Sequence, residues 1–170
     1  MTHEEKIAAI LDRFPFVFPA NPNTGNRPSI GVGPGWLPIV AECAGAMQSF
    51  VAKALFLVRG KNGETKLVSP PQPSIELVRQ KLGTCRFLLG TETWTDDGIA
   101  ECDPVALHDA ALRCHDQVEG MIFFAEYLTS ITCETCGRPG NLVSRKGFLA
   151  TRCPECAKKE NFGSIDSNKH

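Results

Sequence analysis

Apolar residues recur at helical spacing in three stretches of the chain, residues 2–14, 36–54 and 103–130. In each stretch they fall on one side of a helix, which is the pattern of a helix that packs on a core. Pro15 ends the first stretch, because a proline cannot continue a helical hydrogen-bond ladder. Gly120 lies inside the third stretch and is a possible break between two shorter helices. The pattern therefore predicts three or four helices.

Between the second and third helical stretches, the pattern changes to that of strands. Residues 55–60 and 64–68 are β-like runs on either side of Asn62-Gly63. Asparagine followed by glycine favours a hairpin, because both residue types accept positive φ. The sequence therefore predicts a β-hairpin over residues 55–68.

Two further strands follow the prolines of residues 70–73. Residues 74–81 alternate, which places Ile75 and Leu77 on one face, and residues 85–89 form an apolar run after a turn at Leu82-Gly83. With the hairpin, these strands predict a three- or four-stranded antiparallel sheet. The fold class that we expect is α+β, with helices around a small antiparallel sheet and a C-terminal zinc ribbon.

Irregular chain is predicted in two places. Residues 15–35 contain five prolines and four glycines, and residues 90–102 are polar without periodicity. We expect Phe14, Phe16 and Phe18 to anchor the first of these segments to the core, with a docking surface as the alternative.

Four cysteines near the C-terminus carry the strongest signal in the sequence. Cys133 and Cys136 form one Cys-x-x-Cys pair, and Cys153 and Cys156 form a second after sixteen intervening residues. Each pair can aim two sulfurs at one ion, and the intervening residues are long enough for a hairpin that returns the second pair. We predict one structural Zn²⁺ in a ribbon over residues 131–158.

This division leaves a core domain over residues 1–130 and a flexible polar tail over residues 159–170. A catalytic zinc would need an open coordination position, which four cysteines fill. Zinc deaminases also use a Cys-x-x-Cys pair together with an upstream His-x-Glu, but the only such triplet in this sequence, His3-Glu4-Glu5, lies 130 residues before Cys133. A redox role for a Cys-x-x-Cys pair is a further alternative, and two pairs at ribbon spacing favour zinc.

Composition is that of an ordinary globular protein. The chain has 170 residues, 42% hydrophobic and 22% charged, with a net charge of −1, so no global field attracts it to nucleic acid or an anionic membrane. It has no apolar run long enough to span a membrane, and its acidic start does not resemble a secretory signal. We expect a cytoplasmic protein whose eight cysteines are metal ligands or buried thiols, with Cys43 and Cys85 in the core.

A second candidate metal site consists of residues that lie close in sequence, namely Cys102, His108, Cys114 and His115. The two histidines would share a helix face, but the spacing fits no common metal-binding pattern. A polar helix surface with a buried thiol is the simpler interpretation.

Motifs of catalysis are absent from the sequence. It contains no P-loop, no Gly-x-Ser-x-Gly and no Gly-x-Gly-x-x-Gly, and the glycine-rich segment of residues 31–35 is interpreted as a turn. Asp96, Asp97, Glu101 and Asp103 cluster in the polar segment. They are candidates for cation binding or acid–base chemistry, and a solvated loop is the alternative that charge runs favour. We therefore expect no enzyme activity.

The zinc region is locally basic. From residue 138 to residue 159 there are six positive side chains and one negative side chain, Glu155. The candidate partner-binding residues are Arg138, Arg145, Lys146, Arg152 and Lys158. A basic ribbon tip can contact phosphates, dock on an acidic protein surface, or serve only solubility, and charge asymmetry does not choose among these.

Three blocks of sequence together resemble a family. They are residues 35–40 (GWLPIV), residues 78–87 (VRQKLGTCRF), and residues 125–126 (AE) leading into residues 132–140 (TCETCGRPG). In this order they resemble small phage- and prophage-associated bacterial proteins with a C-terminal zinc ribbon and no assigned activity. The chain departs from that group in residues 91–117, which look like an insertion, and in its Cys-x-x-Cys second pair, where relatives often end in Cys-x-x-His.

The resemblance implies a phage or mobile-element setting and no particular reaction. Our leading hypothesis is a non-enzymatic zinc-ribbon protein that docks on a macromolecular protein assembly of host or phage. Such a protein would act as a phage-encoded inhibitor of a host system, for example an anti-CRISPR. The alternative is a nucleic-acid-binding ribbon protein that uses the basic tip.

Overall fold

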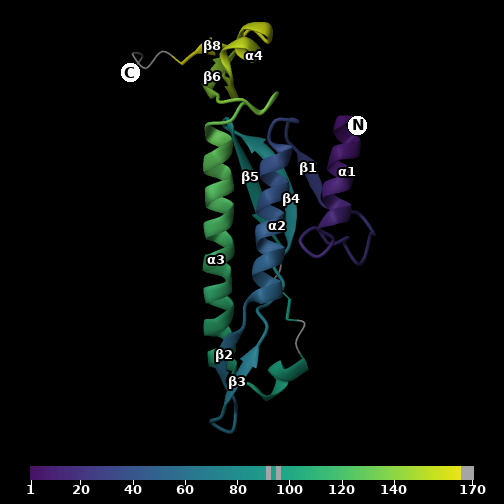
Figure 1. Cartoon of the computed structure of the whole chain (residues 1–170), viewed down its shortest axis with the longest axis vertical. Coiled ribbons are helices and arrows are strands. Elements are labelled where there is room, and N and C mark those ends of the chain that lie inside the picture. Colours follow the sequence, from purple (N-terminus) through teal and green to yellow (C-terminus); the bar gives the residue numbers. More distant parts are fainter. Residues whose placement is uncertain (91–92, 95–96, 166–170) are drawn as a thin grey trace.

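The computed structural model describes residues 1–90, 93–94 and 97–165, except the side chain of Asp97. The molecule is elongated, and two helices run side by side along it (Figure 1). They are α2 (Leu37–Lys53) and α3 (Pro104–Ser130), and they run in opposite directions. A shorter helix, α1 (His3–Arg13), lies beside α2 on the other side. None of the described helices is long and apolar enough to cross a membrane.

Helix α3 is continuous over 27 residues. The side chain of Asp103 caps it by accepting hydrogen bonds from the backbone N–H groups of Val105 and Ala106 at 2.9 and 3.1 Å. Gly120 does not break the helix, so the possible division into two helices is wrong. Packing of the apolar stripe of α3 against α2 and the sheet outweighs the low helix propensity of one glycine.

Behind the two helices lies a three-stranded sheet with the order β1-β4-β5. Strand β1 (Ser29–Gly31) pairs in parallel with β4 (Ile75–Lys81), which pairs antiparallel with β5 (Thr84–Leu89). The α+β class is confirmed, but β1 lies in a stretch that was expected to be irregular, and its parallel pairing makes this sheet mixed. A three-residue strand between prolines is too short for a pattern to identify.

A β-bulge changes which residues of β4 face the core. The register shifts between Ile75 and Leu77, so the fully buried residues of the strand are Ile75 and Val78, and Leu77 is only half-buried. The predicted common face of Ile75 and Leu77 is therefore wrong. The predicted turn before β5 is confirmed, and both Leu82 and Gly83 have positive φ there.

Strands β2 (Phe56–Arg59) and β3 (Thr65–Val68) form the predicted hairpin at the opposite end from the ribbon (Figure 1). They make a separate two-stranded sheet and do not join β4 and β5, contrary to the expectation of one sheet. Of the Asn62-Gly63 pair, only Gly63 has positive φ. The inner face of the hairpin packs on the start of α3 in a second, smaller core.

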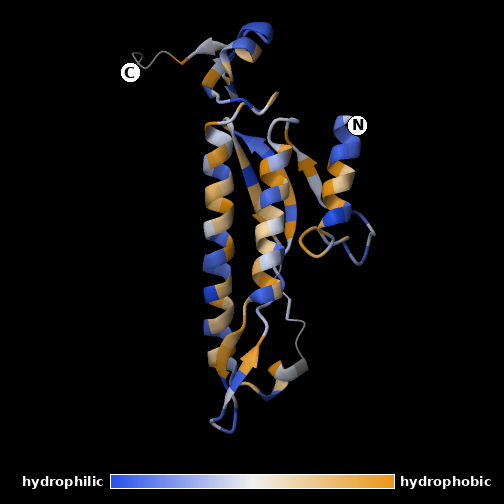
Figure 2. Ribbon diagram, in the orientation of Figure 1, coloured by the Kyte–Doolittle hydropathy of each residue, from blue (hydrophilic) through white to orange (hydrophobic). Residues whose placement is uncertain are grey.

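The main core lies between α1, α2, α3 and the three-stranded sheet, as the apolar colouring of their inner faces shows (Figure 2). Phe14 and Phe18 are buried as expected, but Phe16 is 65% exposed. Cys43 and Cys85 are buried in this core, as predicted. Burial raises the pKa of the Cys43 thiol to about 12 and that of Cys85 still further.

The ribbon contains β6 (Asn141–Arg145), β7 (Phe148–Arg152) and a short helix, α4 (Pro154–Lys159). Strand β8 (Gly163–Ser164) pairs with β6, so the ordered chain continues past residue 159, where the tail was expected to begin. The rest of that predicted tail, residues 166–170, lies outside the described residues.

The predicted insertion, residues 91–117, includes a 3-10 helix, η1 (Asp97–Glu101), and the first half of α3. Residues 91–92 and 95–96 of this segment lie outside the described residues. The last part of the predicted insertion, residues 104–117, is therefore the beginning of α3, a helix that packs on the core.

Candidate metal centre

The four ribbon cysteines converge. Their sulfur atoms all lie within 4.8 Å of one another, and the sulfurs of Cys136 and Cys153 are 3.6 Å apart. Four sulfurs at a Zn–S distance of about 2.3 Å in a tetrahedron would lie about 3.8 Å from one another. All eight cysteines are free, so no disulfide competes for these thiols. The four cysteines are therefore positioned to bind one metal ion.

Local backbone geometry explains the convergence of each pair. After Cys133 the chain turns tightly, and the N–H of Gly137 donates to the carbonyl of Cys133 at 2.9 Å with a positive φ at Gly137. Cys153 is the N-cap of α4, and its sulfur accepts from the N–H of Cys156 at 3.5 Å. A turn and a helix start thus each present two sulfurs to the same point.

Arg138 favours the thiolate that a metal needs. Its Nε–H donates to the Cys136 sulfur at 3.5 Å, which lowers the pKa of Cys136 to about 6. Burial, together with hydrogen bonds from the neighbouring thiols, raises the pKa of Cys156 to about 12. Glu155 holds Arg138 in place through two bonds of 2.9 and 2.6 Å.

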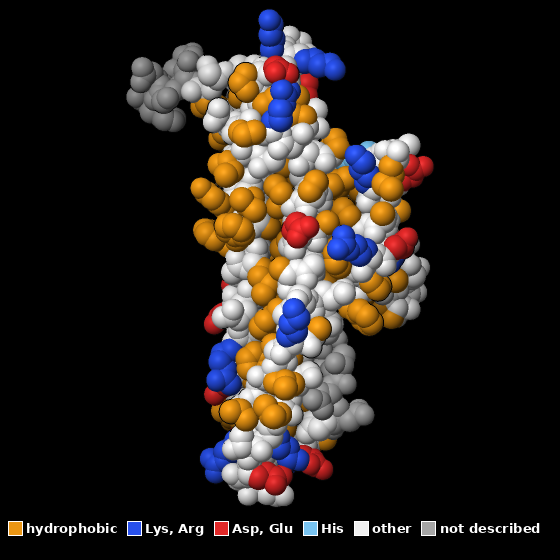
Figure 3. All heavy atoms as spheres, in the orientation of Figure 1, with side chains coloured by type: hydrophobic (Ala, Val, Ile, Leu, Met, Phe, Trp, Pro, Cys, Tyr) orange, Lys and Arg blue, Asp and Glu red, His pale blue; other side chains and the backbone are white. Residues whose placement is uncertain are grey.

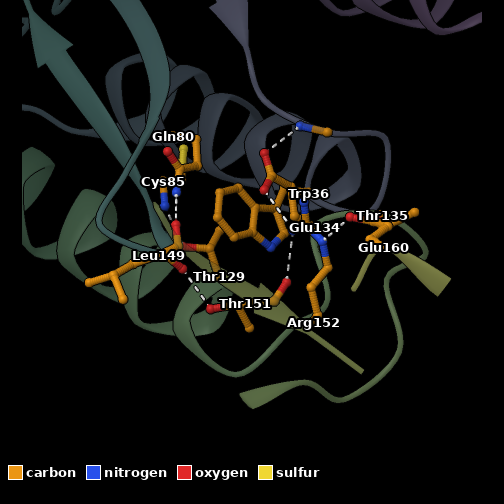
Figure 4. Close-up of polar contacts among 12 residues, drawn as sticks. Trp36, Gln80, Cys85, Thr129, Glu134, Thr135, Leu149, Thr151, Arg152 and Glu160 are labelled. Carbon is orange, nitrogen blue, oxygen red and sulfur yellow. Dashed lines mark hydrogen bonds and ion pairs between the residues drawn. The ribbon is translucent and has the colours of Figure 1, made fainter. Parts of the chain in front are cut away.

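Glu134 joins the metal centre to the core (Figure 4). Its carbonyl accepts from the N–H of Gly35 at 2.7 Å, and its carboxylate accepts from the N–H of Gly33 at 3.1 Å. The same carboxylate pairs with Arg152 at 2.8 Å, and both side chains are only 10% exposed. The residue between the first two ligands therefore binds the loop before α2 and the strand before the third ligand.

Arg152 extends this connection to the end of the ribbon (Figure 4). Its Nε–H donates to Glu160 at 2.9 Å, and Glu160 accepts from Thr135 at 2.8 Å. Burial opposes the charge of Arg152, but its two carboxylate partners hold its pKa above the ordinary value. The chain Glu134–Arg152–Glu160 therefore ties both halves of the ribbon together.

A second set of contacts lies along the sheet. The indole N–H of Trp36, a fully buried residue, donates to the carbonyl of Thr132 at 2.6 Å. The hydroxyl of Thr151 donates to the carbonyl of Gly83, and the amide of Gln80 donates to the carbonyl of Leu149, each at 2.6 Å. These bonds, of which the one from Thr151 is buried, fix the ribbon against the start of α2 and against the β4–β5 turn.

Two glycines before α2 make this close approach possible. A Cβ at Gly35 would lie 2.2 Å from the Cys133 carbonyl oxygen, and one at Gly33 would lie 2.6 Å from the Glu134 carbonyl oxygen. The glycine-rich segment interpreted as a turn is therefore also the seat of the first metal-binding loop. Because this segment lies 100 residues before the cysteines, no local pattern in the sequence predicts that the two are in contact.

Glu134, Glu160, Trp36 and Thr151 were also missed as residues of the site. Their partners are distant in sequence, so no local spacing identifies them. The only signal in the sequence was Trp36 beside glycines. A tryptophan in such a place is expected to be buried, but this does not identify the residue that it contacts.

Three of the five predicted partner-binding residues hold the ribbon together. Arg138 pairs with Glu155, and Arg152 pairs with Glu134 and Glu160. Arg145 donates to the Glu160 carbonyl at 2.8 Å and lies over the ring of Phe162. The other two, Lys146 and Lys158, are exposed, and within the described part of the chain neither has an ion-pair partner.

The local positive balance is smaller than the sequence window indicated. The window from residue 138 to residue 159 stopped short of Glu134 and Glu160, which neutralise Arg152. The exposed positive charge of the ribbon is concentrated at Arg145 and Lys146, at the β6–β7 turn, and at Lys158 and Lys159, on α4.

The other candidate sites do not assemble. Among the described residues, the ribbon cysteines are the only group of three or more metal-ligand side chains whose ligand atoms converge, so Cys102, His108, Cys114 and His115 do not form a second site. Within the acidic segment, Glu101 pairs with Lys66, and Asp103 caps α3.

Of the remaining acidic candidates, Asp96 and the side chain of Asp97 lie outside the described residues.

No family model, no curated protein and no solved structure significantly matches this chain. The resemblance to phage-associated zinc-ribbon proteins therefore stays a prediction.

Proposed function

We propose that this chain is a zinc-dependent docking protein, in which a structural Zn²⁺ fixes the ribbon and the ribbon tip binds an acidic surface on a partner protein. The observation that carries the proposal is the closed set of four sulfurs, two of them buried, locked to the core through Glu134. All four tetrahedral positions are taken by protein, so the metal has a structural role with no place for substrate.

Zn²⁺ is the ion that the donor set favours. Four thiolates in two Cys-x-x-Cys pairs at tetrahedral distances are typical of structural zinc, with an iron–sulfur centre as the chemical competitor. The sulfur separation of 3.6 Å between the two pairs fits a single central ion. Measurement of bound metal in purified protein by mass spectrometry decides between zinc and iron.

The ribbon tip has the side chains of a protein-binding surface. Phe148 is 50% exposed beside the exposed Lys146, and its ring lies 6.3 Å from that of Phe162. Arg145 completes the group by lying over the Phe162 ring. Aromatic and arginine side chains are enriched in protein interfaces, and the lysine gives the tip its preference for an acidic partner.

Nucleic-acid binding is the second candidate, and the exposed lysines at positions 146, 158 and 159 favour it. The internal pairing of Arg138 and Arg152 weighs against it, because those side chains are already neutralised. A protein with so few available cations releases few counterions from DNA or RNA, so its affinity would be low at physiological salt.

A pull-down from host lysate tests the two candidates. We expect a defined protein to be retained by the wild type after nuclease treatment and lost with Lys146→Asp or Phe148→Ser. Aspartate tolerates the positive φ of position 146, so this variant keeps the turn. Lys53→Glu and Phe16→Ser are matched controls at exposed sites on other elements.

If nuclease treatment abolishes retention, the result would favour nucleic acid as the partner. Retention that is unaffected by both tip variants would refute the tip as the docking surface. A partner that belongs to a host defence assembly would support the hypothesis of a phage-encoded inhibitor, which is the most specific form of this proposal.

A further inference from the structure

The C-terminal half of α3 carries an exposed apolar face, which we call the α3 face. It consists of residues at helical spacing on one side of the helix, namely Gly120, Phe123, Phe124, Tyr127 and Ile131. The side chains of Phe123, Phe124 and Tyr127 are 74%, 61% and 54% exposed. Apolar side chains gather along this half of the helix (Figure 3).

The exposed area is large for a protein that has no partner at this face. At roughly 200 Å² for an aromatic side chain, the three rings leave roughly 380 Å² in water. The largest contiguous apolar patch on a typical monomeric protein is about 300–600 Å² and is often functional, so the α3 face is a candidate interaction site. The face is also separate from the ribbon tip, so it does not depend on the proposed function.

The order of residues along the α3 face is self-complementary. In an antiparallel pair of identical helices, a two-fold axis between Phe123 and Phe124 places each of these rings against the other ring of the second copy. The same axis places Gly120 opposite Tyr127. A Cβ at Gly120 would contact nothing within 4 Å, so this glycine leaves a notch on the surface. Tyr127 and Gly120 are thus equally far from the axis, so the side chain of Tyr127 in one copy meets the notch at Gly120 in the other.

Charges do not oppose this pairing. Asp116 falls opposite Ile131 and Glu119 falls opposite Leu128, so no two like charges meet. In this register the contact covers residues 116–131, which is about four turns. From this register, we propose that the α3 face binds the α3 face of a second copy of this chain, in an antiparallel two-fold dimer.

The small contact area favours a weak dimer that forms only at high concentration. The three rings of each copy contribute roughly half of the ~800 Å² per partner that a standard interface buries. With Ile131 and the backbone at Gly120, the contact is at the small end of the range, where dissociation constants are micromolar. The protein is therefore expected to be monomeric when dilute and dimeric when concentrated.

Analytical ultracentrifugation of the zinc-loaded chain tests the proposal. We expect the mass of one 18.5 kDa chain at about 1 μM and twice that mass at about 100 μM. Gly120→Phe adds apolar surface but fills the notch, so it should weaken the dimer by about tenfold or more. Tyr127→Ala removes the side chain that fills it and should weaken the dimer similarly.

The double variant Gly120→Phe with Tyr127→Ala exchanges the bulky and small positions, and it should recover most of the lost association. Leu57→Ser, at a 67% exposed site on β2, is the control and should leave the dimer unchanged. A single chain mass at both concentrations would overturn the proposal. Stronger association of Gly120→Phe would also overturn it, because that result indicates unspecific apolar contact. Loss of a lysate partner on Phe123→Glu, without any dimer, would assign the face to a different protein.

Discussion

Arg152 is the residue whose removal best tests how the ribbon is held. It is only 10% exposed, and it bonds Glu134 and Glu160 at 2.8 and 2.9 Å. Arg152→Met keeps most of the aliphatic volume and removes the charge. The variant leaves the Glu134 carboxylate, itself 10% exposed, with the N–H of Gly33 as its remaining donor.

The expected cost follows from that stranded carboxylate. Removal of one partner from a buried ion pair typically costs about 3–5 kcal/mol, because the other charge stays buried. Glu160 is 28% exposed and keeps Thr135 as a donor, so it adds little. We therefore expect a loss of about 3 kcal/mol, which for a chain of this size lowers the midpoint of thermal unfolding by roughly 6–12 °C.

Differential scanning calorimetry at fixed, saturating zinc measures this loss, since bound metal itself changes the midpoint. Arg27→Met is the matched control, because its ion-pair partner Asp12 is 73% exposed and is not stranded, so the midpoint should change far less. The double variant Glu134→Gln with Arg152→Met should be more stable than Arg152→Met alone, because it removes the stranded charge. Equal midpoints for Arg152→Met and Arg27→Met would refute the argument that Glu134 is stranded.

Three further outcomes are expected. Removal of zinc by a strong chelator should unfold the ribbon and expose Trp36, which a red shift of tryptophan fluorescence reports; an unchanged spectrum would mean that the ribbon folds without metal. Gly35→Ala should lower both stability and zinc affinity, because its Cβ would lie 2.2 Å from the Cys133 carbonyl oxygen, and wild-type values for both would contradict this packing. In zinc-loaded protein at pH 8, the Cys43 and Cys85 thiols should react with a thiol reagent only after unfolding, since burial raises the pKa of each; fast labelling in mass spectra of the native protein would contradict their burial.

The metal ligands could be predicted from sequence because their chemistry is local. Cys133 and Cys136, like Cys153 and Cys156, are close enough in the chain for spacing alone to define each pair. The helices were predicted for the same reason, since their apolar stripes repeat within a few residues. Spacing carries this information only where partners are near neighbours in sequence.

What the sequence did not reveal depends on contacts across the chain. The bulge in β4, the parallel pairing of β1, and the separation of the hairpin from the main sheet are all set by packing between distant segments. The charge of the ribbon was misjudged likewise, because Arg152 finds carboxylates on both sides of the basic window. A count of charges gives no information on which of them are neutralised.

The contact between Trp36 and Thr132 has a consequence for how the chain is made. These residues are 96 positions apart, and the ribbon that supplies Thr132 is synthesised after α2 and the three-stranded sheet. During translation the indole and the adjoining glycine loop therefore lack their final partners until the ribbon has left the ribosome. The ribbon needs only its own residues and a zinc ion to close, whereas its docking completes contacts of high sequence separation, which form slowly. The contacts that dock the ribbon on the core should thus form after the core and the ribbon have each folded.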